Sequence, residues 1–280
     1  MDLSAPALAE DGMQSLCELC NPERYSDPEW MSIHKEVEGY SVDKHVFSHT
    51  NGGYVYRKGW EWTHCVYGLD KLCALNPSVS GLGVGAGREP LIFYFGDRVR
   101  HVAALDLYGN ETWSRASGRE ADSDVVKHPE RWCPKAMDFS RIEFVNSSGT
   151  EIPAQDGKFD FCWSLSSIEH FGGHRAAAKA MREMSRVTRS GGIIALATEF
   201  LLLPEYQHPE YFNRNDLNRW IIDAAPDLEL THEIDWNTPP YEYLVDSVPL
   251  PNGVHRLRRH VVLNDGEVQW TSIMIFFRKR

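Results

Sequence analysis

Glycines recur at every second position from residue 81 to residue 87, within the stretch VSGLGVGAGREPLIFYF. These glycines are Gly81, Gly83, Gly85 and Gly87. They separate a short apolar run from a segment of helical character, so they predict a turn between a strand and a helix. Because glycine has no side chain, a ligand can approach the backbone closely at such a turn. The spacing therefore favours an α/β fold that binds a nucleotide there.

Strand-like and helix-like segments alternate after this turn. Continuous apolar runs predict strands at residues 101–106, 141–146, 159–165 and 192–200. Ahead of the last of these, alanine, methionine and valine residues lie on one stripe from His174 onward, which predicts a helix ended by Gly191 and Gly192. Such alternation is typical of a parallel sheet that is covered by helices on both faces.

Composition excludes several classes of function. The formal net charge of −11 argues against a nucleic-acid partner, whose phosphates would be repelled. No apolar run approaches the ~18 residues of a membrane span, and the N-terminus does not resemble a secretory signal. Six cysteines are scattered along the chain, which favours reduced thiols in the cytoplasm.

A metal site has little support in the sequence. Cys17 and Cys20 form a single CxxC pair, and no second pair exists to complete a structural zinc site. His34 and His45 are the side chains that would have to complete it. Lone pairs of this kind are common, so we predict no metal.

The glycines permit two nucleotide sites. Gly81, Gly83 and Ala86 satisfy the dinucleotide pattern G-x-G-x-x-A, with Asp106 at a suitable distance for a ribose. Gly83, Gly85 and Gly87 satisfy G-x-G-x-G, as in a site for a nucleoside methyl donor. Both patterns use a carboxylate at the end of the second strand, so the glycines alone leave the two alternatives open.

Residues downstream carry a more specific signal. The chain resembles the class I S-adenosylmethionine-dependent methyltransferases over about residues 76–200, in particular their small-molecule branch. The resemblance rests on a chained set of short motifs. These are Pro153 with Asp156-Gly157, Phe159-Asp160 at the start of a strand, Glu169-His170 after it, and Arg182-Glu183 with Arg186-Val187 before Gly191-Gly192.

The resemblance implies a fold and a cofactor. The fold is a Rossmann-like doubly wound seven-stranded sheet with an antiparallel final strand, for which residues 267–280 are well placed. The cofactor is S-adenosylmethionine, bound by the four glycines and Asp106. Asn146 or Ser148 stands where the family has an acid that contacts adenine, and Ser164 completes the expected set. In one departure, Gly81 occupies the position of the acid that helps to hold the methionine ammonium.

Four regions are assigned by position. Residues 1–58 are expected to form an N-terminal cap on the acceptor side, with residues 59–280 as the methyltransferase domain. Residues 107–135 form an insertion that is either a flap over the donor or a surface insertion. The proline-rich residues 235–264 are a further expected acceptor-side segment.

Methyl transfer to a hydroxyl requires a base, because the attacking oxygen must lose its proton. His170 follows the fourth strand at the carboxyl edge of the sheet, where ligands bind in open α/β folds, so it is the expected base. Glu199, at the end of the fifth strand, is expected to orient the acceptor or the base. The structural alternatives are packing beside the donor for His170 and a salt bridge or helix cap for Glu199.

The acceptor is expected to be a small molecule, including a sugar hydroxyl, because aromatic and polar side chains are frequent in the acceptor-side segments. The alternative role of these aromatics is to hold the cap onto the core. They are Trp30, Trp60, Trp62, Tyr206, Tyr211, Trp236, Tyr241 and Tyr243. Two other functions stay open at this stage, an NAD(P)-dependent oxidoreductase and a donor-binding module without catalysis.

Overall fold

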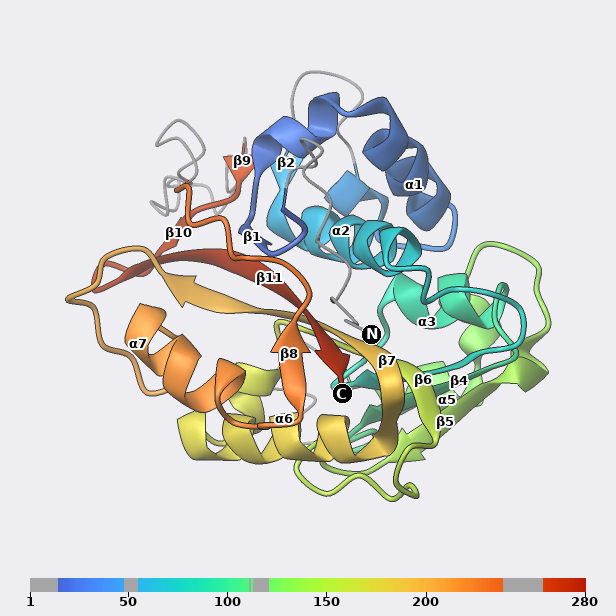
Figure 1. Ribbon diagram of the computed structural model, residues 1–280. Coiled ribbons are helices and arrows are strands. Elements are labelled where there is room, and N and C mark those ends of the chain that lie inside the picture. Colours follow the sequence, from blue (N-terminus) through green and yellow to red (C-terminus); the bar gives the residue numbers. More distant parts are fainter. Residues whose placement is uncertain (1–14, 48–54, 111, 113–120, 239–258) are drawn as a thin grey trace, which may run out of the picture.

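A computed structural model describes residues 15–47, 55–110, 112, 121–238 and 259–280. Its centre is a parallel sheet with the strand order β5, β4, β3, β6, β7 (Figure 1). The strands are β3 Ser80–Val84, β4 His101–Asp106, β5 Ile142–Asn146, β6 Phe159–Leu165 and β7 Thr188–Leu201. The expected doubly wound parallel sheet is confirmed.

The last strand of the chain is antiparallel, as the resemblance implied. β11 (Gln269–Lys279) pairs with β7, and three short strands share its outer edge. They are β1 Glu18–Leu19, β8 Leu228–Leu230 and β10 Leu263–Asn264. The sheet therefore has nine strands among the described residues rather than the expected seven. The two additional strands, β1 and β10, contain only two residues each, too few for an alternating pattern to predict.

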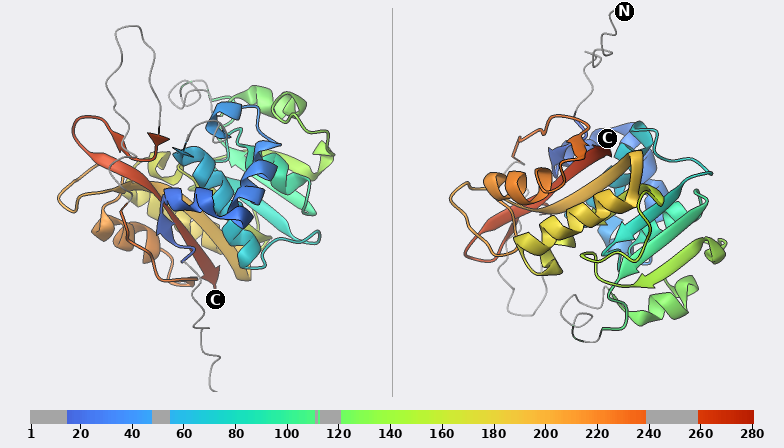
Figure 2. Two further views of the ribbon diagram at one scale, coloured as in Figure 1. Left: turned by 90° about the horizontal axis from the view of Figure 1, so that it is seen from above. Right: turned by 60° about the horizontal axis from the view of Figure 1, so that its bottom comes forward.

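Helices cover both faces of the sheet (Figures 1 and 2). One face carries α1 Pro28–Glu38, α2 Arg57–Lys71 and α3 Pro90–Gly96, and the other carries α6 His174–Val187 and α7 Arg214–Leu217. The helix α5 (Ser123–Lys127) lies in the insertion. A separate two-stranded sheet joins β2 (Val55–Tyr56) to β9 (Arg259–His260) in parallel.

Short helical turns connect these elements. They are η1 Pro22–Ser26, η2 Lys44–Phe47, η4 Pro129–Arg131, η5 Phe139–Arg141, η6 Ile168–Phe171 and the π-helical turn η7 Asn218–Ile222. The start of α1 has a clear local cause. The Asp27 carboxylate accepts hydrogen bonds from the backbone N–H groups of Glu29 and Trp30, and Pro28 supplies a first residue that needs no such partner.

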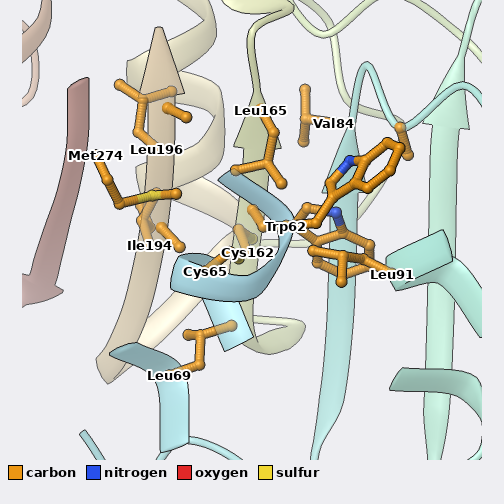
Figure 3. Close-up of a cluster of buried hydrophobic side chains, with 14 of the residues drawn as sticks. Trp62, Cys65, Leu69, Val84, Leu91, Cys162, Leu165, Ile194, Leu196 and Met274 are labelled. Carbon is orange, nitrogen blue, oxygen red and sulfur yellow. The ribbon is translucent and has the colours of Figure 1, made fainter. Parts of the chain in front are cut away.

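The contact between α2 and the sheet forms much of the core. Trp62, Cys65 and Leu69 project from one face of α2, as their three- and four-residue spacing dictates (Figure 3). They pack against side chains from β3, β6, β7 and β11. Burial of each large apolar side chain contributes roughly 1.5–3 kcal/mol. This contact fixes the first turn of α2 above the carboxyl ends of the strands.

The boundary between α6 and β7 differs from the expectation. α6 ends at Val187 and β7 begins at Thr188, ahead of Gly191 and Gly192. Thr188 already pairs with Phe159 of β6, and the register shifts before the next pairs. A Cβ on Gly192 would lie 2.6 Å from the Asp160 carbonyl oxygen. Gly192 therefore permits a close approach of two strands, and Gly191 adopts a φ of +75° within β7, so neither glycine ends the helix.

Candidate functional site

Three adjoining cavities lie along the carboxyl ends of the parallel strands. An inner cavity of about 80 Å³ and a central cavity of about 440 Å³ share Gly85, Asp106 and His170. An outer cavity of about 330 Å³ shares Arg57, Lys58, Trp62 and Glu89 with the central one. Together they form one cleft at the edge where open α/β sheets bind ligands.

The turn after β3 brings backbone to the surface of this cleft. Gly85 and Gly87 adopt φ angles of +67° and +49°, a region that favours glycine. A Cβ at Gly85 would lie 2.6 Å from the Cβ of Ser167, so a side chain there would disturb the cleft wall. Both glycines line the central cavity, and Gly85 also lines the inner one.

Asp106 closes β4 beside this turn. Its Oδ2 accepts a hydrogen bond from the Gly87 N–H at 2.8 Å, and its Oδ1 accepts one from the Leu107 N–H at 2.7 Å. A carboxylate oxygen can accept more than one hydrogen bond. Because the side chain is only 8% exposed and faces two cavities, it can accept hydrogen bonds from a ribose.

The other predicted donor-site residues separate into two groups. Ser148 lines the inner cavity, on the loop after β5. Asn146 is exposed at the end of β5 and Ser164 is buried within β6, and neither lines one of the three cavities. Gly81 and Gly83 are buried in β3 beneath two rings of β6. A Cβ on Gly81 would lie 2.3 Å from the Phe161 ring, and one on Gly83 would lie 2.5 Å from the Trp163 ring.

His170 lies at the junction of the inner and central cavities, on the turn η6 that follows β6. Its Nδ1 is 3.2 Å from Oε2 of Glu210, and its side chain is 35% exposed. The sequence analysis missed Glu210. A carboxylate that contacts one ring nitrogen orients the imidazole.

The turn that carries Glu210 is held by a second histidine. Nδ1 of His208 accepts hydrogen bonds from the backbone N–H groups of Glu210 and Tyr211. Its ring stacks on Tyr211 with a centroid separation of 3.9 Å. His208 therefore shapes the loop and does not line any of the three cavities.

Glu199 lines the central cavity but pairs with a different residue from the expected one. Its Oε1 accepts a hydrogen bond from Nη1 of Arg57 at 2.7 Å, and the same nitrogen lies 3.0 Å from Glu61 Oε1. Glu199 therefore takes part in a salt bridge, which was its structural alternative. The carboxylate that contacts His170 belongs to Glu210 instead. Burial raises the pKa of Glu199, and the Arg57 charge opposes that rise.

A further carboxyl group lies beneath the site. Glu169 is completely buried and accepts a hydrogen bond from the Thr198 hydroxyl at 2.9 Å. Burial, followed by the charge of Glu199, raises the pKa of Glu169 to about 8. Glu169 is therefore protonated at neutral pH in the folded protein.

The predicted aromatic residues have different roles. Trp62 lines the central and outer cavities, whereas Trp30 and Trp60 are fully buried and stack on His34 and His64. Tyr206, Tyr211 and Trp236 do not line the three cavities. Tyr241 and Tyr243 lie outside the described residues, as does Trp113 of the insertion. Trp132, at the other end of the insertion, lines the outer cavity.

Two of the residues considered for a zinc site, Cys17 and His34, contact other groups. The Cys17 thiol donates to the Phe276 carbonyl, and the Nδ1 of His34 contacts the Thr63 hydroxyl. Within the described ranges, no group of three or more histidine, cysteine or acidic residues could hold a metal ion. A search of the same ranges for helices long and apolar enough to cross a membrane found none.

Comparison with known proteins distinguishes the two nucleotide alternatives. A family model described as a methyltransferase domain matches residues 82–196, from β3 into β7. This match and the observed fold support a class I S-adenosylmethionine-dependent methyltransferase. Over 194 residues this methyltransferase is 27% identical to a sarcosine/dimethylglycine N-methyltransferase from Halorhodospira halochloris. That match covers 68% of this chain and 60% of the relative's length.

Solved structures of methyltransferases share the fold. One assigned as a sarcosine dimethylglycine methyltransferase, from Galdieria sulphuraria, has a TM-score of 0.50 and 16% identity, and the match covers 80% of this methyltransferase and 87% of that chain. A geranyl diphosphate C-methyltransferase from Streptomyces coelicolor A3(2) has a TM-score of 0.49 and 16% identity, covering 91% and 99%.

S-adenosylmethionine is the cofactor of this family, and the residues of the methyltransferase fit it. Gly85 packs too closely against Ser167 to carry a side chain, and it lines both the inner and the central cavity. Asp106 can accept hydroxyls of a ribose, and the inner cavity beside it is lined by Leu107, Ser148 and Phe171. A mixed apolar and polar wall of this kind suits a purine ring.

Proposed function

We propose that this protein methylates a hydroxyl group of a small molecule, a sugar included. The observation that carries the proposal is the His170–Glu210 pair, which lies where the inner and central cavities meet. A base at that junction is next to both the proposed nucleoside site and the larger space for an acceptor. A hydroxyl acceptor is the class that benefits most from such a base, because it must lose a proton during attack.

The donor, His170 and Glu210 have separate proposed roles. Bound S-adenosylmethionine supplies an already activated methyl group, so the protein mainly has to position the acceptor and exclude water. His170 takes the proton of the acceptor hydroxyl, and Glu210 holds the imidazole and stabilises its cationic form. The proton then leaves to solvent from the partly exposed ring.

The acceptor side of the cleft has the lining of a small-molecule site. Rings from four separate segments face the outer cavity, and Tyr56 stacks on His260 with a centroid separation of 4.4 Å. These rings are those of Tyr56, Trp62, Trp132 and His260. Aromatic walls with scattered polar groups suit a sugar or a flat ring system. We also propose a cytoplasmic location, because all six cysteines are free thiols.

An amine acceptor is the second candidate. Three acidic side chains line the central cavity, those of Glu89, Glu199 and Glu210, and a bound cation would favour their ionised forms. The name of the curated relative, an N-methyltransferase, supports the same alternative. An amine would also need to lose a proton before attack, so His170 would keep its role.

A panel of hydroxyl and amine acceptors, assayed with methyl-labelled S-adenosylmethionine, tests the proposal. We expect labelled ethers as products and their loss in His170→Ala. Products labelled only on nitrogen would replace the proposal with the second candidate. Tight binding of the donor without any methylated product would instead favour a binding module that lacks catalysis.

A further inference from the structure

We propose that Glu89, just before α3, holds the protonated amino group at the amino-acid end of the donor, with Lys58 across the cavity facing the donor carboxylate. This inference rests on the proposed function, since it assumes the same donor in the same cleft. It adds a residue outside the glycine and Asp106 motifs, and it names the ligand group that this residue contacts.

Glu89 is a buried carboxylate at the boundary of two cavities. It is 9% exposed and lines both the central and the outer cavity. Its Oε1 accepts a hydrogen bond from the indole Nε1 of Trp163. In the parts of the chain that the structure describes, no ion pair joins Glu89 to a basic side chain. A buried carboxylate beside open space is a natural partner for an ammonium group.

The packing of β6 explains why the acid of this subsite, Glu89, stands just before α3 and not in β3. Rings of Phe161 and Trp163 fill the positions where side chains of Gly81 and Gly83 would lie. The two rings stack on each other, with a centroid separation of 5.9 Å, and leave no room for a carboxylate on β3. The same Trp163 holds Glu89 by hydrogen bonding, so one side chain both blocks β3 and positions the acid at the cavity wall.

Lys58 supplies the opposite charge. It lines the same two cavities as Glu89, from the first turn of α2. Its Nζ donates to Glu61 Oε2 at 3.0 Å and to the Leu165 carbonyl at 3.2 Å. An ammonium group has three donors, so one is available for a ligand carboxylate. A cation and an anion lining the same two cavities match the zwitterionic end of an amino acid.

Protonation gives this subsite a measurable signature. Burial raises the pKa of Glu89 to about 8, against the opposing effects of the Trp163 hydrogen bond and the Lys58 charge. The carboxyl group is therefore largely protonated at neutral pH without ligand. A bound ammonium favours the ionised form, so binding at neutral pH should release about one proton from this residue.

Calorimetry with three ligands tests the inference. We would titrate the full chain and Glu89→Gln with S-adenosylhomocysteine, its analogue without the amino group, and 5′-methylthioadenosine, which lacks the amino-acid end. The wild type should bind S-adenosylhomocysteine roughly ten- to a hundredfold more tightly than the deaminated analogue, because a hydrogen bond to a charged group contributes about that much affinity. In Glu89→Gln that preference and the proton release should vanish, while affinity for 5′-methylthioadenosine stays unchanged.

The control is Glu29→Gln, which removes an exposed carboxylate paired with Lys71 on the surface. It should keep the full preference, and thermal melts of both variants should show that they fold. A Glu89→Gln protein that keeps the wild-type preference for the amino group overturns the inference. Because the readout is binding, it is independent of methyl transfer: the preference can vanish as expected even if no hydroxyl acceptor is methylated.

Discussion

The proposed donor half and the proposed acceptor half of the cleft are built in different ways. The donor half uses the ends of neighbouring strands, with Gly85 after β3, Asp106 at the end of β4 and Ser148 after β5. The acceptor half combines segments far apart in sequence, among them Tyr56, Glu210 and His260. A short motif can therefore identify the donor half, whereas the acceptor half exists only after folding.

The two halves also hold their charges differently. Asp106 is held by backbone N–H groups, which the strand–turn geometry supplies. Glu199 and Glu61 are held by the guanidinium of Arg57, a side chain from another element. Substitutions in the donor half should therefore change binding, and substitutions in the acceptor half should change catalysis or stability.

The largest effect is expected from His170→Ala. Loss of a general base typically lowers turnover by about 10²- to 10⁴-fold. Affinity for S-adenosylhomocysteine should change little, as calorimetry would show, because Asp106 and the glycine turn remain. Glu210→Gln should reduce turnover less, since it keeps the imidazole. Unchanged turnover in His170→Ala would assign His170 a packing role.

Arg57→Met should cost stability. Removal of one partner from a buried ion pair typically costs about 3–5 kcal/mol, because Glu199 is then left without its counter-charge and Glu61 keeps only Lys58. Denaturant unfolding measures this loss. The control is Arg189→Met, which breaks an exposed pair with Asp160 and should cost at most about 1 kcal/mol. Equal costs for both variants would contradict the described network.

Asp106→Asn should weaken binding of S-adenosylhomocysteine by roughly ten- to a hundredfold, because a charged acceptor of the ribose hydroxyls becomes neutral. Titration calorimetry gives the affinity. The matched control, Asp156→Asn, changes a carboxylate that is 79% exposed on the surface, and it should bind like the wild type. Wild-type affinity in Asp106→Asn would mean that the ribose lies elsewhere.

The last effect, the smallest when taken per pH unit, is a slope of stability with pH. The pKa of Glu169 is raised from 4.5 to about 8 in the folded protein, chiefly by burial and then by Glu199. The stability that protonated Glu169 contributes is fully present below its pKa in the unfolded chain. This stability is lost as the pH rises to about 8, at up to about 1.4 kcal/mol per pH unit. The free energy of unfolding of Glu169→Gln, measured across this pH window, should lack that part of the slope. An identical slope in both proteins would contradict a protonated Glu169.

Sequence predicted the parts of the fold that rest on local patterns. The buried runs of β3, β4 and β6 and the stripe of α6 were correctly located, because periodicity reports directly on burial. The short strands β1 and β10 were not, because pairing of two residues depends on the long partner strand β11. The end of α6 was misplaced because Thr188 joins the sheet early.

The candidate site shows the same limit. Gly85, Asp106 and His170 follow strand ends, so sequence order indicates where they lie. Glu210 carries no motif, and its contact with His170 spans 40 residues of sequence. The partner of Glu199 could not be inferred either, because Arg57 lies on a helix that precedes every strand of the parallel sheet. Long-range pairs of this kind are fixed by tertiary packing.

A crystal structure of the protein with S-adenosylhomocysteine tests the central claim most directly. We predict that the ribose hydroxyls lie within hydrogen-bonding distance of the Asp106 carboxylate, with adenine in the inner cavity and the sulfur atom directed into the central cavity. A nucleoside bound elsewhere, or an Asp106 side chain turned away from the ribose, would contradict the account.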